Sequence, residues 1–412
     1  MIDPLKIAMV AACPFPTSQG SQVLIRELSQ ALVKRGHDVH VVTYHFGEDQ
    51  ECPDLKIHRI PKLIRYNKFR SGPALRKPIL DLLLAWKLNQ VVRDEKIQII
   101  HCHNYEAPVS ALPVRLFRKI PVVYHSHNTM SDEFYTYFRL KFPQKLAKYA
   151  AYLMDRFIPR SSDFAIAINR RVAKFLMDMG MPPSRVKFIP PGIDYGLPVD
   201  APDPDLREKY GMGSGPLIVY AGNLDGYQRL DLLLEALSEV FRENQHARLI
   251  VMSSSDPGPF LRDANKNGIS EKIVILKDPA FALIREVMAL ATLAVNPRIS
   301  WSGYPIKLLN YMAAGLPVVA FEGAAPAIED GINGALAPPL DTRAFAYKIN
   351  NLLRQSHLAA KLGEEAMRTA VYDHDWNEIV EDIEDIYAKL LGLGIVSPSS
   401  KSFSDKRLMT AG

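Results

Sequence analysis

Apolar runs and amphipathic stretches alternate along the first half of the chain. Lys6–Ala12 is a short apolar run, and a loop rich in proline and serine follows it. Residues Gln22–Arg35 repeat apolar positions at helical spacing, namely Val23, Leu24, Leu28, Ala31 and Leu32. Gly36 ends this helix and Asp38–Thr43 begins the next strand. The strand–helix–strand order predicts a parallel sheet covered by helices, with later strands at Ile97–His101, Pro121–Tyr124, Phe164–Ile168 and Val186–Pro190.

The second half repeats the alternation after a stretch, Pro190–Pro204, that holds five prolines and is predicted to be an interdomain linker. Strands are then predicted at Leu217–Ala221, Ala247–Met252, Ile273–Leu276, Leu293–Asn296 and Pro317–Phe321. Helices are predicted at Arg229–Arg242, Phe281–Ala291, Pro305–Ala314 and 376–391. We therefore expect an α/β protein with two doubly wound parallel-sheet domains, 1–195 and 196–375, facing across a cleft. The final helix is 376–391, and residues 392–412 are predicted to be disordered.

Composition agrees with a two-domain globular protein, because 48% of the 412 residues are apolar and 23% are charged. Three cysteines are too few for a disulfide framework, no apolar run reaches about 18 residues, and no signal pattern opens the chain, so we expect a cytoplasmic protein. Residues 1–195 carry 29 basic and 17 acidic side chains, whereas residues 196–412 carry 21 and 28. This asymmetry predicts two domains with different partners.

The clearest candidate site lies between residues 296 and 312. A predicted strand ends at Arg298, a short loop carries Ser302 and Gly303, and Pro305 is expected at the first helical position. A helix start attracts anions, so a cation in its first turn, Lys307, is unfavourable unless an anion lies beside it. We therefore predict a phosphate or diphosphate site. The alternative has Lys307 in solvent and Arg298 paired with a carboxylate, and we favour the anion site because three features converge.

Two other polar patterns have weaker implications. The loop Pro14–Gln22 carries Gly20 and could admit a ligand to a helix start, or it could be an ordinary turn, since it lacks the spacing of a nucleotide fingerprint. The pairs His101/His103 and His125/His127 end two predicted strands, with both members of a pair on one face. Zinc is conceivable but disfavoured, because Cys102 would point to the opposite face. We expect no metal, one histidine in the cleft as a hydrogen-bond partner, and at least two of the four in structural roles.

Two basic segments interleave with apolar side chains, Arg59–Lys77 and Phe138–Arg160. Such segments suit an anionic membrane surface or a phosphorylated acceptor, and equally a plain solvated face. Attachment to the inner face of the plasma membrane therefore remains open beside a purely cytoplasmic location. No groove-reading or base-stacking motif accompanies the basic residues, so we expect no nucleic-acid partner.

Ordered sequence blocks over residues 5–391 resemble the GT-B fold glycosyltransferases of the large retaining group called family four. The blocks are the Pro-x-Pro…Gly loop with the helix ending Val33–Val39, His101–His103, Val122–Asn128, Phe188–Asp194, Val219–Leu224, Asp231–Ala236, Tyr311–Ala320 and Gly331–Gly334. The helix after Asp375-Trp376 resembles the one that crosses back to the first domain in such enzymes.

The resemblance implies two Rossmann-like domains, transfer of a sugar from a nucleotide-sugar donor with retained anomeric configuration, and no metal or other cofactor. It places His127, Arg298 and Lys307 in catalysis. It implies that Gly20 and Ser21 line the diphosphate and acceptor side. The other implied donor-binding residues are Asn223, Gln228, Arg229, Ser302, Gly303, Tyr304, Pro305 and Asn310.

The chain departs from the family pattern at charged positions. The usual Arg/Lys pair falls at Asn223 and Gln228, or at Arg229 if the gap is shifted, and the usual Glu-x7-Glu falls at Ser302 and Asn310. Arg298 and Lys307 would then supply the positive charge on the diphosphate. We expect transfer to a lipid-linked or cell-envelope glycan acceptor. The alternatives are a non-catalytic nucleotide-sugar-binding protein and, less favoured for want of paired acids, a nucleotide-sugar epimerase.

Overall fold

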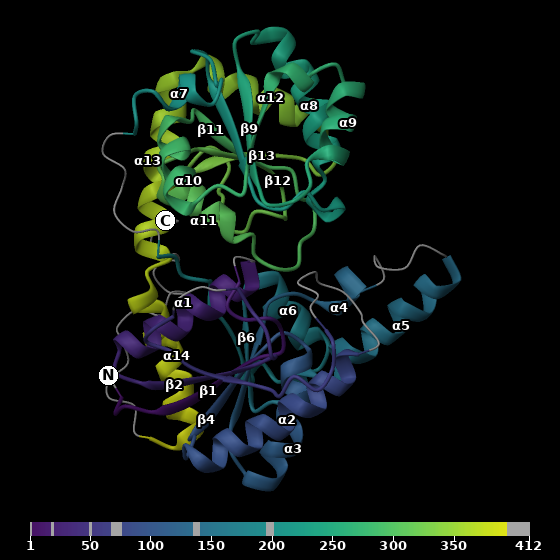
Figure 1. The fold of residues 1–412 in the computed structure, drawn as a ribbon, viewed down its shortest axis with the longest axis vertical. Helices are drawn as coiled ribbons and strands as arrows, with labels where there is room; N and C mark the ends of the chain where they lie inside the picture. The colour runs from purple at the N-terminus through teal and green to yellow at the C-terminus, as the bar shows by residue number, and fades with distance from the viewer. Residues whose placement is uncertain are drawn as a thin grey trace. The chain divides into compact units, whose positions relative to one another are not determined.

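The computed structural model describes residues 2–17, 20–48, 52–66, 76–134, 141–194 and 202–393, with the side chains of 141–143 excepted. The chain divides into two compact units (Figure 1). The first comprises Met1–Gly192, Ser302–Tyr304 and Asp375–Gly412, and the second comprises Ile193–Trp301 and Pro305–His374. The boundary expected at 195–196 lies outside the described residues, as does the tail expected to be disordered at 392–412 apart from residues 392 and 393.

The first unit is built on a seven-stranded parallel sheet in the order β3-β2-β1-β4-β5-β6-β7. The strands are β1 (Lys6–Ala11), β2 (Asp38–Thr43), β3 (Lys56–Arg59), β4 (Ile99–His103), β5 (Val122–Ser126), β6 (Phe164–Ala167) and β7 (Val186–Phe188). The central strands β4, β5 and β6 are buried along their whole length, which is why their sequences are continuous apolar or neutral runs rather than alternating ones.

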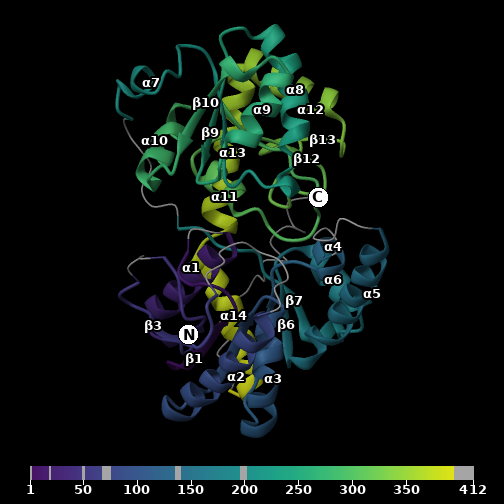
Figure 2. The same ribbon diagram turned by 45° about the vertical axis from the view of Figure 1, so that its right-hand side comes forward.

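Helices cover both faces of this sheet (Figure 2). They are α1 (Gly20–Lys34), α2 (Lys77–Asp94), α3 (Glu106–Arg118), α4 (Met130–Glu133), α5 (Lys141–Phe157), α6 (Arg170–Asp178) and α14 (Trp376–Leu391). One face packs on α2 and α3 through a core that includes Val10 and Cys102. His101 alternates to the opposite face, where its Nδ1 lies 2.6 Å from the Tyr387 hydroxyl of α14.

The second unit holds a six-stranded parallel sheet in the order β10-β9-β8-β11-β12-β13. The strands are β8 (Leu217–Ala221), β9 (Arg248–Ser253), β10 (Ile273–Lys277), β11 (Leu293–Asn296), β12 (Val318–Phe321) and β13 (Gly334–Ala337). The helices are α7 (Leu206–Lys209), α8 (Leu230–Glu243), α9 (Gly258–Lys266), α10 (Phe281–Leu290), α11 (Ile306–Ala313), α12 (Thr342–Arg354) and α13 (Ser356–Asp373). Leucines of α8 pack with Phe345 of α12 and with β8 and β11 in one hydrophobic core.

The two parallel sheets confirm the predicted α/β fold class, and the structure refines several elements. Pro305 is the residue before α11 rather than its first helical residue, because its ψ of 96° is extended. The strand expected at Val186–Pro190 ends at Phe188. Strands β3 and β13 were not predicted, since the former reads Lys-Ile-His-Arg and the latter is made of small residues, so neither has a strong apolar signal.

Helix α14 has the predicted bounds and is fixed to the first unit by a buried ionic group. Glu384 is 4% exposed, and its carboxylate lies 2.8 Å from Arg35 Nη2 and 3.0 Å from His37 Nε2. Burial alone would raise the pKa of Glu384, but the hydrogen bonds from His37 and Arg35 outweigh it and lower that pKa to about 2. At the start of the helix, the Trp376 ring lies where a Cβ on Gly192 would collide with it, which explains the glycine of the Pro-Pro-Gly block.

Candidate functional site

The amino group of Lys307 lies at the start of α11 among neutral partners. Its Nζ is 2.9 Å from Gln228 Oε1 and 4.1 Å from the centroid of the Tyr220 ring. No ion pair joins Lys307 to a carboxylate in the part of the chain that the structure describes. The side chain is partly exposed, although its amino group is densely surrounded by protein atoms. An ammonium group at a helix start is disfavoured unless an anion compensates it.

Arg298 adds a second positive charge to this place. Its Nη2 donates to Ser300 Oγ at 3.1 Å, and its guanidinium carbon lies 5.6 Å from the Tyr227 ring centroid. Burial, and then the charge of Arg298, lower the pKa of Lys307 well below its ordinary value. The two cations are therefore close enough to repel, as expected of a site that receives an anion.

Neutral amides connect the two cations. Gln228 Nε2 donates to Asn223 Oδ1 at 3.1 Å, and Asn223 Nδ2 donates to the Tyr227 hydroxyl at 2.7 Å. Gln228 is buried, whereas Asn223 and Tyr227 are exposed, so the group opens to solvent on one side. We call these residues the Lys307 network: Tyr220, Asn223, Tyr227, Gln228, Arg298 and Lys307. The positions where the family pattern expects charges thus hold amides that orient a lysine instead.

The loop after β8 is shaped to fit this network. Gly222 has a φ of +141°, and a Cβ at this position would lie 3.4 Å from Lys307 Nζ. Tyr311 of α11 ties the helix to the same strand, because its hydroxyl accepts from Ala221 N at 2.7 Å and lies 3.3 Å from Ala221 O. Strand β8 and helix α11 therefore hold Gly222 and Lys307 in a fixed relation.

Three predicted donor-binding residues of this unit lie outside the Lys307 network. Arg229 pairs with Asp231 at 2.7 Å, so a carboxylate already neutralises its charge. Asn310 is half-buried on α11, three residues beyond Lys307. Pro305 immediately precedes α11 and is buried.

Other predicted site residues belong to the first unit. Ser302, Gly303 and Tyr304 group with it: Ser302 Oγ donates to Asp132 Oδ2 at 2.6 Å, and Asn169 Nδ2 donates to the Gly303 carbonyl at 2.9 Å. All three are buried. Gly20 and Ser21 are the first residues of α1, with Gly20 exposed, while residues 18–19 of that loop lie outside the described residues.

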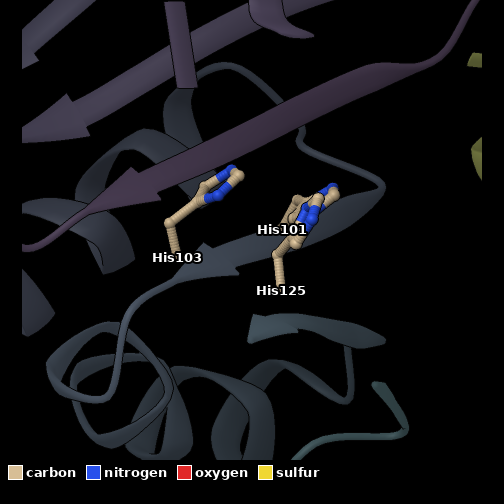
Figure 3. A group of neighbouring side chains, drawn as sticks. All are labelled: His101, His103 and His125. Carbon is tan, nitrogen blue, oxygen red and sulfur yellow. The ribbon is translucent and has the colours of Figure 1, made fainter. Parts of the chain in front are cut away.

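The four predicted histidines form one buried cluster at the carboxyl ends of β4 and β5 (Figure 3 shows three of them). His101 Nε2 lies 3.2 Å from His125 Nδ1, and His103 Nδ1 lies 2.9 Å from His127 Nε2. Burial lowers the pKa of His127 to about 4 and that of His101 to about 3. Burial, followed by neighbouring histidines, also lowers the pKa of His103 and His125 well below the ordinary value. The four rings are therefore neutral near pH 7, and His127 can act there as a hydrogen-bonding group rather than as a cation.

The cluster offers nitrogen atoms of the kind that zinc binds, and one pair of its rings is stacked. The ligand atoms of His101, His103 and His125 lie within 4.8 Å of one another. The rings of His101 and His103 are nearly parallel, with an interplanar angle of 4° and centroids 4.7 Å apart. Parallel rings direct their lone pairs side by side, whereas a metal needs them to converge on one point. The expectation of no metal stays a prediction.

Sequence reasoning missed three residues of the second unit, two of which belong to the Lys307 network. Tyr220 and Tyr227 contact the two cations through their rings. Asn296 ends β11 fully buried, and neither atom of its side-chain amide has a hydrogen-bond partner among the described residues. A buried amide without partners is rare and often marks a ligand site. A polar residue closing the apolar run Leu-Ala-Val-Asn was the available signal for Asn296.

The two basic segments differ in how much of them the structure describes, and Lys62, Leu63, Arg65 and Arg76 of the first are exposed. In Arg59–Lys77, Lys77 pairs with Glu106 at 2.7 Å and Arg59 donates to the Tyr44 carbonyl, while residues 67–75 lie outside the described residues. Helix α5, within Phe138–Arg160, presents exposed basic and aromatic side chains. Among the described residues, no helix is both long enough and apolar enough to span a bilayer.

Comparison with known proteins identifies two family regions. Residues 18–196 match the family described as Glycosyltransferase Family 4, and residues 215–355 match Glycosyl transferases group 1. The chain is 24% identical over 397 residues to N-acetyl-alpha-D-glucosaminyl L-malate synthase of Bacillus anthracis, covering 94% of this chain and 98% of that protein. It is 27% identical over 237 residues to a GDP-mannose-dependent alpha-(1-6)-phosphatidylinositol monomannoside mannosyltransferase of Mycolicibacterium smegmatis, covering 54% of this chain and 61% of that protein.

Solved structures share the fold at low sequence identity. Sucrose-phosphate synthase from Thermosynechococcus elongatus superposes with a TM-score of 0.79 at 16% identity, over 95% of this chain and all of that one. Anabaena HepE in complex with UDP-glucose gives 0.73 at 18% identity, over 93% of this chain and all of that one. With both family regions matched in order and two parallel-sheet units of this kind, the chain belongs to the GT-B glycosyltransferases of family four and is a group 1 glycosyltransferase.

Proposed function

We propose that this glycosyltransferase is a retaining enzyme that moves a sugar from a nucleotide-sugar donor to a lipid-linked or cell-envelope glycan acceptor at the cytoplasmic face of a membrane. The observation that carries the donor assignment is the Lys307 network. Lys307 and Arg298 approach each other at the start of α11, and Lys307 has only neutral partners among the described residues. A diphosphate is the ligand whose charge this arrangement would compensate.

The proposed chemistry is electrostatic. When the bond between the anomeric carbon and the diphosphate oxygen breaks, the electron pair stays on that oxygen and negative charge develops on the leaving nucleotide diphosphate. Lys307, Arg298 and the N–H groups at the start of α11 would stabilise this charge. The acceptor hydroxyl oxygen would form the new bond to the anomeric carbon, and its proton would pass to the departing diphosphate oxygen. The Gln228 amide would keep Lys307 oriented before the donor binds. We propose that no metal is required, and that the neutral His127 ring donates or accepts a hydrogen bond to the sugar.

Names of similar proteins support the substrate classes without fixing them. HepE has been solved with UDP-glucose, and the name of the Mycolicibacterium smegmatis relative includes GDP-mannose and phosphatidylinositol monomannoside. Nucleotide sugars are thus the donors to test first, and a lipid-linked glycan is the acceptor class to test first. Retention of the anomeric configuration follows from the family resemblance and remains part of the proposal.

Calorimetry with a panel of UDP- and GDP-sugars, followed by product analysis with membrane extract as acceptor source, tests this function. Lys307→Ala and Arg298→Ala should each abolish transfer while the circular dichroism spectrum is kept. Lys266→Ala, which removes an exposed lysine from α9 in the same unit, is the matched control and should transfer normally. Near-normal turnover in both site variants would refute the assignment, as would donor binding without any product in the unaltered protein. Full activity in a chelator is expected, and NMR of the product should show the donor's anomeric configuration.

Proton uptake gives a second reading of the same site. Burial and then the charge of Arg298 lower the pKa of Lys307, so a bound diphosphate should raise that pKa. Where the amine is neutral before binding, it takes up a proton with the donor, and the calorimetric enthalpy of nucleotide binding then differs between buffers of different ionisation enthalpy. Lys307→Ala should remove any such difference, and a difference that persists in this variant would show that another group takes up the proton.

A further inference from the structure

Helix α5 exposes several large apolar and aromatic side chains to solvent. Leu146, Tyr149 and Phe157 are 64%, 61% and 61% exposed, and Tyr152 is 44% exposed. Lys145 and Lys148 are exposed on the same helix. Four large apolar or aromatic side chains on one solvated helix are unusual, because such side chains normally lie in a core. Both ribbon views show α5 at the outer edge of the first unit (Figures 1 and 2).

The opposite face of α5 fixes the helix to the unit. Ala147, Ala151 and Asp155 recur every four residues and are 5%, 0% and 0% exposed. Asp155 accepts hydrogen bonds from Met130 N at 2.9 Å and Ser131 N at 2.8 Å, so its carboxylate satisfies the start of α4. This anchoring sets the rotation of the helix and thereby which side chains face outward.

The charge of the outward face is of one sign. Between Lys141 and Arg160 the only acidic residue is Asp155, and it is the one that points inward. Arg160, just beyond the helix, is exposed. A second copy of this chain would bring like charges together, which disfavours self-association through this face. Aromatic side chains interleaved with lysines match the interfacial region of a bilayer rich in anionic lipid, where rings enter the headgroup layer and lysines meet the phosphates.

We infer that the outward face of α5, made of Lys145, Leu146, Lys148, Tyr149, Tyr152 and Phe157, docks the protein on an anionic phospholipid surface. The inference rests on the proposed function, because it assigns the surface from which a lipid-linked acceptor would be reached. It can be tested separately, since lipid binding needs neither donor nor turnover.

Co-sedimentation of the full chain with vesicles tests the inference. Vesicles of equal parts phosphatidylglycerol and phosphatidylcholine should bind the protein, and pure phosphatidylcholine vesicles should not. The Lys145→Gln and Lys148→Gln double variant should weaken binding by roughly 30-fold, at about fivefold per basic side chain near a charged surface. The Tyr149→Ser and Phe157→Ser double variant should lose at least tenfold at every salt concentration. Lys361→Gln with Arg343→Gln, exposed residues of α13 and α12, should bind like the unaltered protein.

The outcomes separate the proposals. Equal vesicle binding by the lysine variant and its control overturns the inference, as does equal binding to neutral and anionic vesicles. Absent vesicle binding together with lysine-dependent binding of single-stranded RNA would make this face a nucleic-acid surface and also overturns it. Thermal unfolding monitors the fold, and since both lysines are exposed their removal tests the inference even if the aromatic variant is unstable. Nucleotide-sugar calorimetry on the lysine variant should match the unaltered protein, so the donor assignment is judged independently.

Discussion

Two charged groups in the molecule are surrounded by protein but are partnered in opposite ways. In the first unit the Glu384 carboxylate meets Arg35 and His37, so charge is compensated inside the fold. In the second unit the Lys307 amine meets a neutral amide and an aromatic ring, with Arg298 adding more positive charge. Removing one member of an ion pair inside the fold destabilises the protein. A charged group without an internal counter-charge can instead form its ion pair with a bound ligand. The difference predicts that the first should matter for folding and the second for binding.

The largest expected effect is on donor turnover. Lys307→Met keeps the length and apolar stem of the side chain but removes its charge, and we expect the rate of sugar transfer to fall at least 100-fold, a typical cost for losing one charge-stabilising group. Thermal stability should stay within about 1 kcal/mol of the unaltered protein, because no internal ion pair is lost. A large loss of stability with retained activity would mean that Lys307 stabilises the fold, as Glu384 does, and does not serve donor binding.

The Glu384→Gln substitution should show the reverse pattern. It leaves Arg35 and His37 without the carboxylate, and breaking a buried ion pair costs about 3 kcal/mol of unfolding free energy. Glu381→Gln is the matched control, since it removes a half-exposed carboxylate from the same Arg35 and should cost less than about 0.5 kcal/mol. Urea unfolding followed by circular dichroism measures both. Equal losses of unfolding free energy in the two variants would show that the burial of Glu384 does not strengthen its ion pair with Arg35.

Sequence reasoning reached one of these groups through local pattern and missed the other. Lys307 could be predicted because strand, loop and helix start are contiguous, so its place in the first turn follows from the helical period alone. Its partner Gln228 lies 79 positions away, and the contact depends on how the loop after β8 folds back. The link between Glu384 and Arg35 spans 349 positions and depends on where α14 packs. Contacts between residues so far apart in the sequence leave no local pattern. The alternation of strands and helices that positions both groups does leave one.

Lowering the pH should weaken the first group selectively. Glu384 has a pKa of about 2 in the folded protein, against 4.5 for an ordinary glutamate, so its stabilising contribution is complete above about pH 5 and is lost as the pH falls towards 2. The full contribution is at most about 3 kcal/mol. Unfolding free energies measured from pH 7 to pH 3 should fall less steeply in Glu384→Gln. Parallel pH profiles for the two proteins would exclude Glu384 as the source of the acid sensitivity.

The smallest effect should come from the loop that accommodates Lys307. Gly222→Ala forces an alanine into a φ of +141° and sets its Cβ 3.4 Å from Lys307 Nζ, so we expect a loss of about 1 kcal/mol in stability. Gly226→Ala, where an added Cβ meets nothing within 4 Å, is the control in the same loop and should be nearly neutral. If the Lys307 amine serves the donor, Gly222→Ala should also weaken nucleotide-sugar binding in calorimetry, because the strained loop and the methyl group beside Nζ alter how the amine meets the diphosphate. If Gly222→Ala lowers stability but leaves nucleotide-sugar binding unchanged, the close approach of Gly222 to Lys307 serves packing alone. Lys307 would then be a structural group, as Glu384 is.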